Sequence, residues 1–378
     1  MHDSLWSEDK SLLSDRELVR LRPKMWIIST DEWGLRELLW ALFAHSLDEY
    51  RAESGDQITL SLNSDGSATV IDNGRGIPIN VAQENKSKLE DALTTLRPGV
   101  RYTGSLKVSG FPYPLRLFVV NALSSRLIVE VRRDGYLWRQ EYKDGEPLAN
   151  VARTKKVTDT GTSITFWPDP AILGDSEFNL ELVCKDMREV CYLNPNLTVR
   201  VIDARSQAKQ IFTYHFPDGL ISYVQYLNSN KTTLHKPISI DTIIDTIEIH
   251  CALQYNSSNA EDVRSYVNNF STTDGGPHLT GFKEALIRVL DELGHQTGLL
   301  PAEIFVSSYV SEGLCAVISV WLAEPWFRRA SLTELANEDV MDKINDAVAK
   351  DLMAHFEVSP EDLEAIVGKI RQSSEKSR

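Results

Sequence analysis

The stretch VIDNGRGIP (residues 70–78) decides the fold of the first half of this chain. It begins as the end of a strand, because SATVID (67–72) alternates polar and apolar residues, as QITLSLN (57–63) does before it. The SDGS turn between these two segments predicts a β-hairpin. The glycines of DNGRG then allow the backbone to turn tightly. The pattern predicts that Asp72 is held at the end of a strand, beside a glycine turn.

Outward from this stretch, helical and strand-like segments alternate, which predicts an α+β fold with two domains. Residues 31–53 are expected to form a helix, because leucines recur along one face from Leu35 to Leu47. Residues 209–217 are expected to be a loop near the domain boundary. Further strands are predicted at 126–133, 136–143, 162–168, 196–203, 246–255 and 316–324, and further helices at 177–193, 281–293, 339–356 and 360–371.

Composition narrows the class of protein. The 378 residues carry 40 Lys and Arg against 54 Asp and Glu, a net charge of −14. Strong autonomous DNA binding is not expected from this balance, since DNA-binding surfaces are basic. No run has the 18 apolar residues of a membrane span, and the polar first residues lack the features of a secretory signal. The four cysteines are expected to be free thiols, and the protein to be cytoplasmic.

Several stretches, in the same order as in the family, resemble the bacterial DNA gyrase B and topoisomerase IV B subunit family. VIDNGRGIP matches the family's strand-to-turn motif almost letter for letter. GLRELLWALFAHSLDEY (34–50) aligns without a gap with its first ATPase helix. The remaining matches are ELVRLRPKMWI (17–27), KVSG (107–110) with VVNALS (119–124), TGTSITFWPD (160–169), YLNSNKTTLH (226–235), NNFSTTDGGPHLTGF (268–282) and AIVGKIRQ (365–372).

The resemblance implies an N-terminal arm at residues 1–24, a GHKL-type ATPase α/β sandwich at 25–212 and a ribosomal-S5-like transducer domain at 213–378, with a long C-terminal helix. The family continues from this point into a metal-binding TOPRIM domain. The chain is therefore not expected to cleave DNA by itself.

The resemblance also implies a nucleotide site whose base pocket is retained. Asp72 matches the aspartate that accepts from the adenine amino group, and Thr162 matches the threonine that supports this aspartate through its hydroxyl. Gly76 belongs to the turn beneath the base, and Ile77 and Pro78 would pack on the base.

The groups that hydrolyse ATP are replaced. Gapless alignment puts Ala41 at the family's general base and His45 at its Mg²⁺-binding asparagine. Alanine cannot accept a proton, and Glu37 lies a full helical turn before it. Imidazole is a poor ligand for Mg²⁺. Two alternatives remain for His45: a transition-metal site with Asp48 and Glu49, or a hydrogen bond to a neighbouring carboxylate. The hydrogen bond is the interpretation adopted here, so no metal site is predicted.

Glu49 itself is expected to pair with Arg75, as in the family.

The phosphate-binding lid is also altered, because GFPYPLRLF (110–118) carries Phe111, Pro114 and Arg116 where the family has glycines. The family's QTK loop corresponds to WFRRASLTELAN (326–337), which lacks the Gln and Lys pattern.

These replacements predict a gyrase B-like paralogue that binds without hydrolysing ATP. ATP or ADP is an expected ligand without turnover, and Mg²⁺ is not expected as a cofactor. The expected partners are a second copy, a topoisomerase B subunit or a small molecule. The small molecule is expected because Arg75 and Arg139 match positions that family inhibitors use. Two alternatives stay open: new small-molecule chemistry by His45 and Tyr113, and an active ATP-dependent type II topoisomerase subunit.

Overall fold

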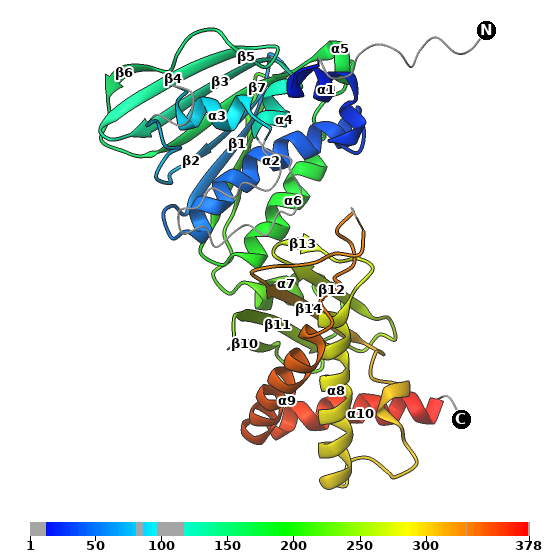
Figure 1. Ribbon diagram of the computed structural model, residues 1–378. Helices are drawn as coiled ribbons and strands as arrows, with labels where there is room; N and C mark the ends of the chain where they lie inside the picture. The colour runs from blue at the N-terminus through cyan, green and yellow to red at the C-terminus, as the bar shows by residue number, and fades with distance from the viewer. Residues whose placement is uncertain (1–12, 81–85, 97–116, 330, 377–378) are drawn as a thin grey trace, which may run out of the picture. The chain divides into compact units, whose positions relative to one another are not determined.

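The computed structural model describes residues 13–80, 86–96, 117–329 and 331–376, and it divides into two compact units (Figure 1). Unit 1 comprises the chain up to Cys191 together with Asn196–His215. Unit 2 comprises Tyr192–Pro195 and the chain from Phe216 onward. Each unit has its own sheet, with helices packed on it. The α+β class with two sheets agrees with the sequence-based prediction.

Unit 1 is built on a nine-stranded sheet in the order β5-β4-β3-β7-β2-β1-β8-β9, with β6 paired to β4. Only β1 and β8 are parallel; the other pairs are antiparallel. The strands are β1 (Gln57–Asn63), β2 (Ala68–Asp72), β3 (Ser124–Arg133), β4 (Tyr136–Lys143), β5 (Glu146–Pro147), β6 (Ala152–Lys156), β7 (Gly161–Pro168), β8 (Thr198–Ala204) and β9 (Gln210–Tyr214).

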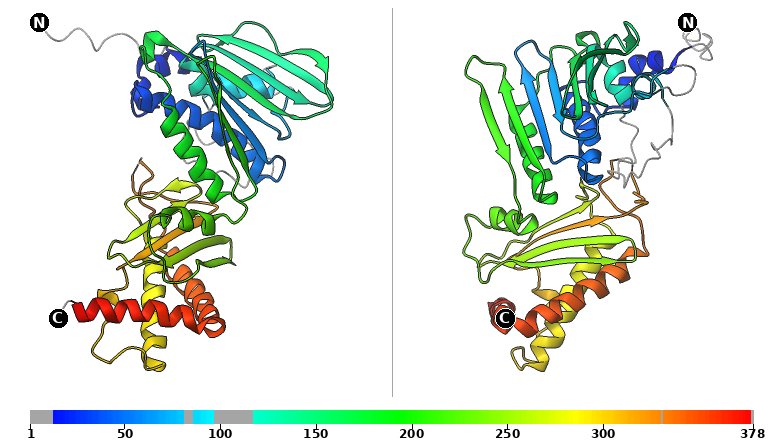
Figure 2. Two further views of the ribbon diagram at one scale, coloured as in Figure 1. Left: turned by 180° about the vertical axis from the view of Figure 1, so that it is seen from behind. Right: turned by 90° about the vertical axis from the view of Figure 1, so that its left-hand side faces the viewer.

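Helices cover one face of this sheet, here called the inner face (Figures 1 and 2). The longest is α2 (Glu32–Arg51), whose first turn is capped by the Asp31 carboxylate accepting from the Trp33 N–H. Its leucine stripe is buried against β1 and β2. The others are α3 (Lys88–Thr94), α4 (Leu117–Ala122), α5 (Pro170–Leu173) and α6 (Leu180–Leu193).

The described part of the predicted N-terminal arm forms helix α1 (Asp15–Leu21), followed by the short 3-10 helix η2 (Pro23–Met25). Ser14 and Glu17 form a reciprocal capping box at the start of α1. Val19 is fully buried, and α1 packs on α4. An ion pair between Arg20 and Asp169 fixes the last turn. This stretch is therefore an integral part of unit 1.

Unit 2 has a five-stranded sheet in the order β10-β11-β14-β12-β13. Helix α7 lies on one face, and helices α8 and α9 pack on the other (Figure 2). The strands are β10 (Ile238–Ile244), β11 (Ile247–Tyr255), β12 (Asp262–Val267), β13 (Phe270–Ser271) and β14 (Leu314–Trp321), and the helices are α7 (Leu220–Leu227), α8 (Pro277–Gln296), the 3-10 helix η4 (Val306–Ser308), α9 (Val340–Val358) and α10 (Pro360–Lys376).

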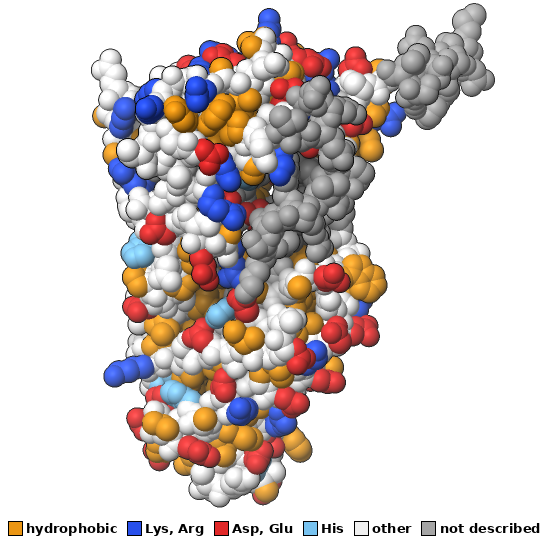
Figure 3. Space-filling model, turned by 60° about the vertical axis from the view of Figure 1, so that its left-hand side comes forward, with side chains coloured by type: hydrophobic (Ala, Val, Ile, Leu, Met, Phe, Trp, Pro, Cys, Tyr) orange, Lys and Arg blue, Asp and Glu red, His pale blue; other side chains and the backbone are white. Residues whose placement is uncertain are grey.

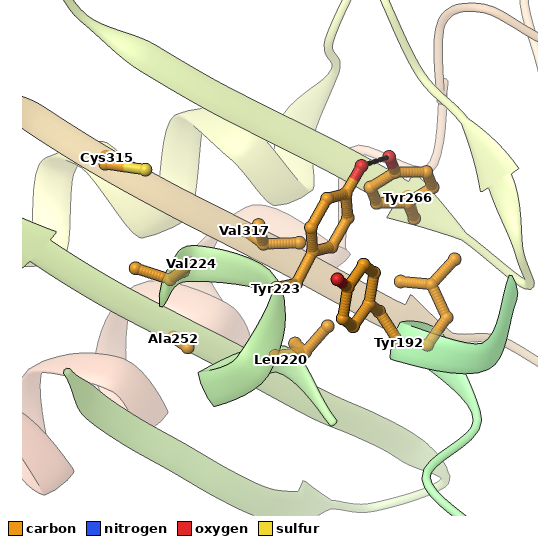
Figure 4. Packing of buried hydrophobic residues seen from close by; sticks show 9 residues of the cluster. Tyr192, Leu220, Tyr223, Val224, Ala252, Tyr266, Cys315 and Val317 are labelled. Carbon is orange, nitrogen blue, oxygen red and sulfur yellow. Dashed lines mark hydrogen bonds between the residues drawn. The ribbon is translucent and has the colours of Figure 1, made fainter. Parts of the chain in front are cut away.

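Aromatic side chains fill the space between α7 and its sheet (Figure 4). The rings of Tyr192 and Tyr223 are stacked with centroids 4.6 Å apart. The Tyr223 and Tyr266 hydroxyls are hydrogen-bonded at 2.9 Å. Arg264 donates to the Tyr223 hydroxyl at 2.9 Å. The buried hydroxyls of Tyr223 and Tyr266 therefore have partners, as a packed core requires.

Most predicted elements are confirmed, with one clear error. The segment at 209–217 was expected to be a loop but contains β9, which pairs with β8 from Asp203↔Gln210 to Val199↔Tyr214. A partner strand can order a stretch that has no strong pattern of its own. Within the described residues, all four cysteines are free thiols, and no helix is long and apolar enough to cross a membrane.

Candidate functional site

A buried carboxylate lies where β2 ends. Asp72 is 4% exposed, and donors from three parts of unit 1 reach it. The backbone N–H groups of Gly74 and Thr162 donate to its Oδ1 atom at 2.9 and 3.1 Å. The Ser46 hydroxyl, on α2, donates to its Oδ2 atom at 2.9 Å. The glycine turn, β7 and α2 therefore meet at one side chain.

These three hydrogen bonds leave Asp72 with spare accepting capacity. An ionised carboxylate offers about four lone-pair positions on its two oxygens. From the described part of the chain, Oδ1 receives two donors, whereas Oδ2 receives only the Ser46 hydroxyl. The remaining position on Oδ2 suits an amino group, such as that on a heteroaromatic ring, because buried acceptors are normally paired.

Thr162 supports Asp72 in a different way from the one expected. Its backbone N–H, rather than its hydroxyl, donates to the carboxylate. The hydroxyl instead accepts from the Ile77 N–H at 3.3 Å. A hydroxyl that accepts still has its own proton to donate. Asp72 and Thr162 together can therefore offer one acceptor and one donor to a ligand.

Two glycines are required by the backbone around this carboxylate. Gly161 has φ +138°, and a Cβ there would lie 2.1 Å from the Asp72 carbonyl oxygen. Gly76 has φ +78°, and a Cβ there would lie 2.9 Å from the Arg132 carbonyl oxygen. Arg132 also donates to the Asp72 carbonyl at 2.8 Å, and Arg133 donates to the Gly76 carbonyl at 2.6 Å. The end of β3 thus holds the turn in place.

The predicted pair between Glu49 and Arg75 is present. The Arg75 guanidinium donates to both carboxylate oxygens of Glu49, at 3.0 and 3.1 Å. The backbone N–H of Arg75 donates to the Oε2 atom of Glu49 at 2.7 Å. Burial raises the pKa of Glu49, but the hydrogen bonds from Arg75 outweigh it, so the pKa lies below its usual value. The pair anchors the turn to α2.

Three residues on α2, Glu37, Ala41 and His45, were considered in the sequence analysis as positions for hydrolytic or metal-binding groups. Ala41 is buried at 4% exposure and has no group to accept a proton. Glu37 accepts from the Ile28 N–H at 2.7 Å, and burial raises its pKa. Within the residues that the structure describes, the Nε2 atom of His45 is buried and has no hydrogen-bond partner. None of the described carboxylates therefore forms the expected hydrogen bond at that nitrogen.

Other predicted site residues lie elsewhere. Arg139 pairs with Glu130 on β3 and forms ion pairs with Glu130 and Glu141 at 2.8 and 2.5 Å. Because strand residues alternate between faces, Arg139 lies on the face opposite to Val131 and Thr162. In the described part of the chain, no three His, Cys, Asp or Glu side chains gather as metal ligands. Phe111, Tyr113, Pro114 and Arg116 lie outside the described residues.

Comparison with known proteins identifies the family. The structure resembles the 43K ATPase domain of Thermus thermophilus gyrase B, solved with an aminocoumarin, with a TM-score of 0.84 and 30% identity over 96% of this chain and 97% of that one. The chain belongs to the DNA gyrase B family. The DNA gyrase B family model matches residues 219–378. A Francisella tularensis topoisomerase IV ATP-binding domain, in complex with a small-molecule inhibitor, gives a TM-score of 0.79 at 26% identity over 96% of this chain and 97% of that one.

The family's full-length members are longer than this chain. The DNA gyrase subunits B of Archaeoglobus fulgidus and Thermotoga maritima are 37% and 36% identical over 96% and 98% of the chain. The chain spans 58% and 59% of their lengths. The GHKL and transducer fold that the resemblance implied is thereby confirmed.

Within this family fold, Asp72, Thr162, Gly76, Ile77, Glu49 and Arg75 are brought together through the contacts above. Sequence reasoning missed Ser46 and the two arginines at the end of β3. Ser46 carried a usable signal: it is a polar residue on the buried stripe of α2, where a hydroxyl needs a partner. Arg132 and Arg133 carried none, since they act through carbonyl groups about 60 residues away in the chain.

Proposed function

We propose that this gyrase B-like chain binds a base-containing ligand at Asp72 and does not hydrolyse ATP. The observation that carries the proposal is the contrast around one pocket. Asp72 is fully supported and keeps one acceptor position, while Ala41 stands at the family's general-base position. We also assign residues 25–212 and 213–378 to the ATPase-like and transducer-like domains.

The chemistry of the α2 face supports binding without turnover. A positioned general base contributes roughly 10²–10⁴-fold to a rate, and Ala41 supplies none. Glu37 is held by the Ile28 N–H, so it is committed to the start of the domain rather than to a water. The imidazole of His45 favours transition metals over Mg²⁺. ATP or ADP would then bind without an effective metal.

A protein with this site would act through what it binds. The relative from Thermus thermophilus is described with an aminocoumarin, so a retained pocket could take up inhibitors aimed at that site. The same fold could pair with a second copy or with a topoisomerase B subunit in the cytoplasm. Recovery of the tagged chain from native cells with neither a topoisomerase subunit nor a second copy would count against pairing.

Calorimetric titration tests the pocket. Adenine and a non-hydrolysable ATP analogue are expected to bind the wild-type chain, with the same affinity in the presence and absence of Mg²⁺. Asp72→Asn should abolish both signals, because it replaces the spare acceptor with an N–H donor. Phosphate release should equal that of the Asp72→Asn control. Wild-type turnover that disappears in Asp72→Asn would overturn the proposal.

A further inference from the structure

A row of side chains continues from the Asp72 pocket across the inner face of the sheet to its edge. Thr162 pairs with Val131 on β3, and Val131 pairs with Trp138 on β4. Trp138 pairs in turn with Arg153 on β6. Paired residues share a face and neighbouring strands lie about 4.8 Å apart. The row therefore extends roughly 14 Å outward from Thr162.

A bulge in β6 determines which cations join this face. The pairing shifts between Leu137 and Trp138, which leaves Thr154 as an extra residue whose hydroxyl donates to the Leu137 carbonyl at 3.0 Å. Because of the extra residue, Arg153 and Lys156, three apart, lie on the same face.

Arg153 and Lys156 flank two aromatic rings. Lys156 pairs with Tyr136, which shares the inner face with Trp138 because the two are two residues apart on β4. The Arg153 guanidinium lies 4.4 Å from the centroid of the Tyr136 ring. Lys155 pairs with Leu137 and points to the opposite face.

These groups are available to a ligand. All five residues of β6 are exposed, and Tyr136 and Trp138 are partly exposed. In the part of the chain that the structure describes, neither Arg153 nor Lys156 has an ion-pair partner. The nearby Asp134 and Asp159 carboxylates lie instead against Arg133 and Arg132, at 3.7 and 2.9 Å.

The local charge contrasts with that of the whole chain. Residues 132–136 and 152–159 hold five basic and two acidic side chains, in a protein of net charge −14. Figure 3 turns the β6 side of Figure 1 forward, and Lys and Arg side chains gather on the upper part of the face drawn. A local excess of positive charge beside aromatic rings is complementary to a planar anion.

We propose that Trp138, Tyr136, Arg153 and Lys156 form a second subsite, next to the base pocket, that takes a planar group carrying a negative charge. The proposal rests on the proposed function and specifies its ligand: an elongated molecule with an amino-bearing ring at Asp72 and an anionic aromatic end toward β6. The rings supply flat apolar contact. Arg153 presents a fork that fits a carboxylate, sulfonate or phosphate.

Protection of an exposed sheet edge is the competing explanation for these charges. It requires charge on β6 but does not depend on the face that the charge occupies. Lys155 and Lys156 are adjacent, equally charged and on opposite faces. They therefore form a matched pair of positions for a test.

The test titrates the full chain with 1-naphthoate, its neutral analogue 1-naphthamide and adenine. Naphthoate should bind the wild type, and Arg153→Gln with Lys156→Gln should weaken it about tenfold, since charge-assisted contacts are lost. Lys155→Gln should change its affinity less than about twofold, because it is on the other face. Naphthamide should bind more weakly than naphthoate and respond to none of these changes. Unchanged melting temperatures would show that the variants fold.

Two results would overturn the subsite. One is that naphthoate does not bind; the other is that Lys155→Gln weakens naphthoate binding as much as Arg153→Gln with Lys156→Gln does. Asp72→Asn separates this inference from the proposed function. It should abolish adenine binding and leave naphthoate binding unchanged. Failure of adenine to bind the wild type would defeat the proposed function, whereas face-dependent naphthoate binding would still support the subsite. Adenine and naphthoate should also bind together, and mutual exclusion would contradict two adjacent subsites.

Discussion

The candidate site has two sides, the strand ends and helix α2, and the hydrogen bonding of their buried groups differs. On the sheet side, Asp72 receives donors on both oxygens, and Gly161 adopts a conformation that only glycine tolerates easily. On the helix side, Ala41 offers no polar group, and no described residue pairs with the Nε2 atom of His45. The difference teaches that the buried carboxylate of Asp72 lies inside a hydrogen-bond network, whereas the positions of Ala41 and His45 are not built around one.

The sharpest challenge to the sheet side is Gly161→Ala. The new Cβ would meet a backbone oxygen at 2.1 Å, so we expect a loss of about 3 kcal/mol in the free energy of unfolding. Gly66→Ala is the matched control, because Gly66 also has positive φ (+80°) but nothing within 4 Å of a Cβ. It should cost about 1 kcal/mol. Urea unfolding measures both, and equal losses would show that crowding at Asp72 is unimportant.

Asp72→Asn should separate recognition from stability. The Asn Oδ1 can keep the donors from Gly74 and Thr162, and the Ser46 hydroxyl can turn to accept, so unfolding should cost less than about 1 kcal/mol. Adenine binding should fall by roughly 10–100-fold, which abolishes its calorimetric signal, since a charge-assisted hydrogen bond becomes a clash of donors. Comparable losses of stability and of affinity would argue that Asp72 is only structural.

Ser46→Ala probes the direct hydrogen bond between α2 and the Asp72 carboxylate. The change leaves Oδ2 of Asp72 without its donor, and we expect unfolding to cost about 1 kcal/mol. Ser61→Ala on the outer face of β1 should stay within about 0.5 kcal/mol of wild type. If both serines behave alike in thermal unfolding, α2 and the carboxylate are not coupled through this hydroxyl.

Glu37→Gln gives the smallest effect, on the helix side. Burial raises the pKa of Glu37 above its usual 4.5 in the folded state, so the folded protein holds this proton more tightly than the unfolded chain. Wild-type stability therefore falls as pH rises through the raised pKa. Glutamine does not titrate. The free energy of unfolding of the variant, relative to that of the wild type, should therefore increase between pH 4 and pH 7. A stability difference that is constant over that range would contradict the prediction.

Sequence patterns predicted most of the fold and only part of the site. The α2 leucine stripe and the alternation in β1 and β2 are local signals, and each predicted its element. β9 was missed because a partner strand orders it. Asp72 and the Glu49–Arg75 pair were predicted through resemblance to a known family. Arg139 was assigned to the site the same way, yet strand register places it on the opposite face of the sheet.

By itself, the sequence determined which chemical groups this protein possesses: a carboxylate with a glycine turn at residues 70–78, and an alanine and a histidine where hydrolysis would need other residues. Only the tertiary structure decided which groups meet. Ser46 lies 26 residues from Asp72 and Thr162 lies 90 residues from it, and the row ending at Arg153 depends on a single bulge. Such contacts follow from strand register and helix packing, because shifting either by one residue would exchange the groups on the face.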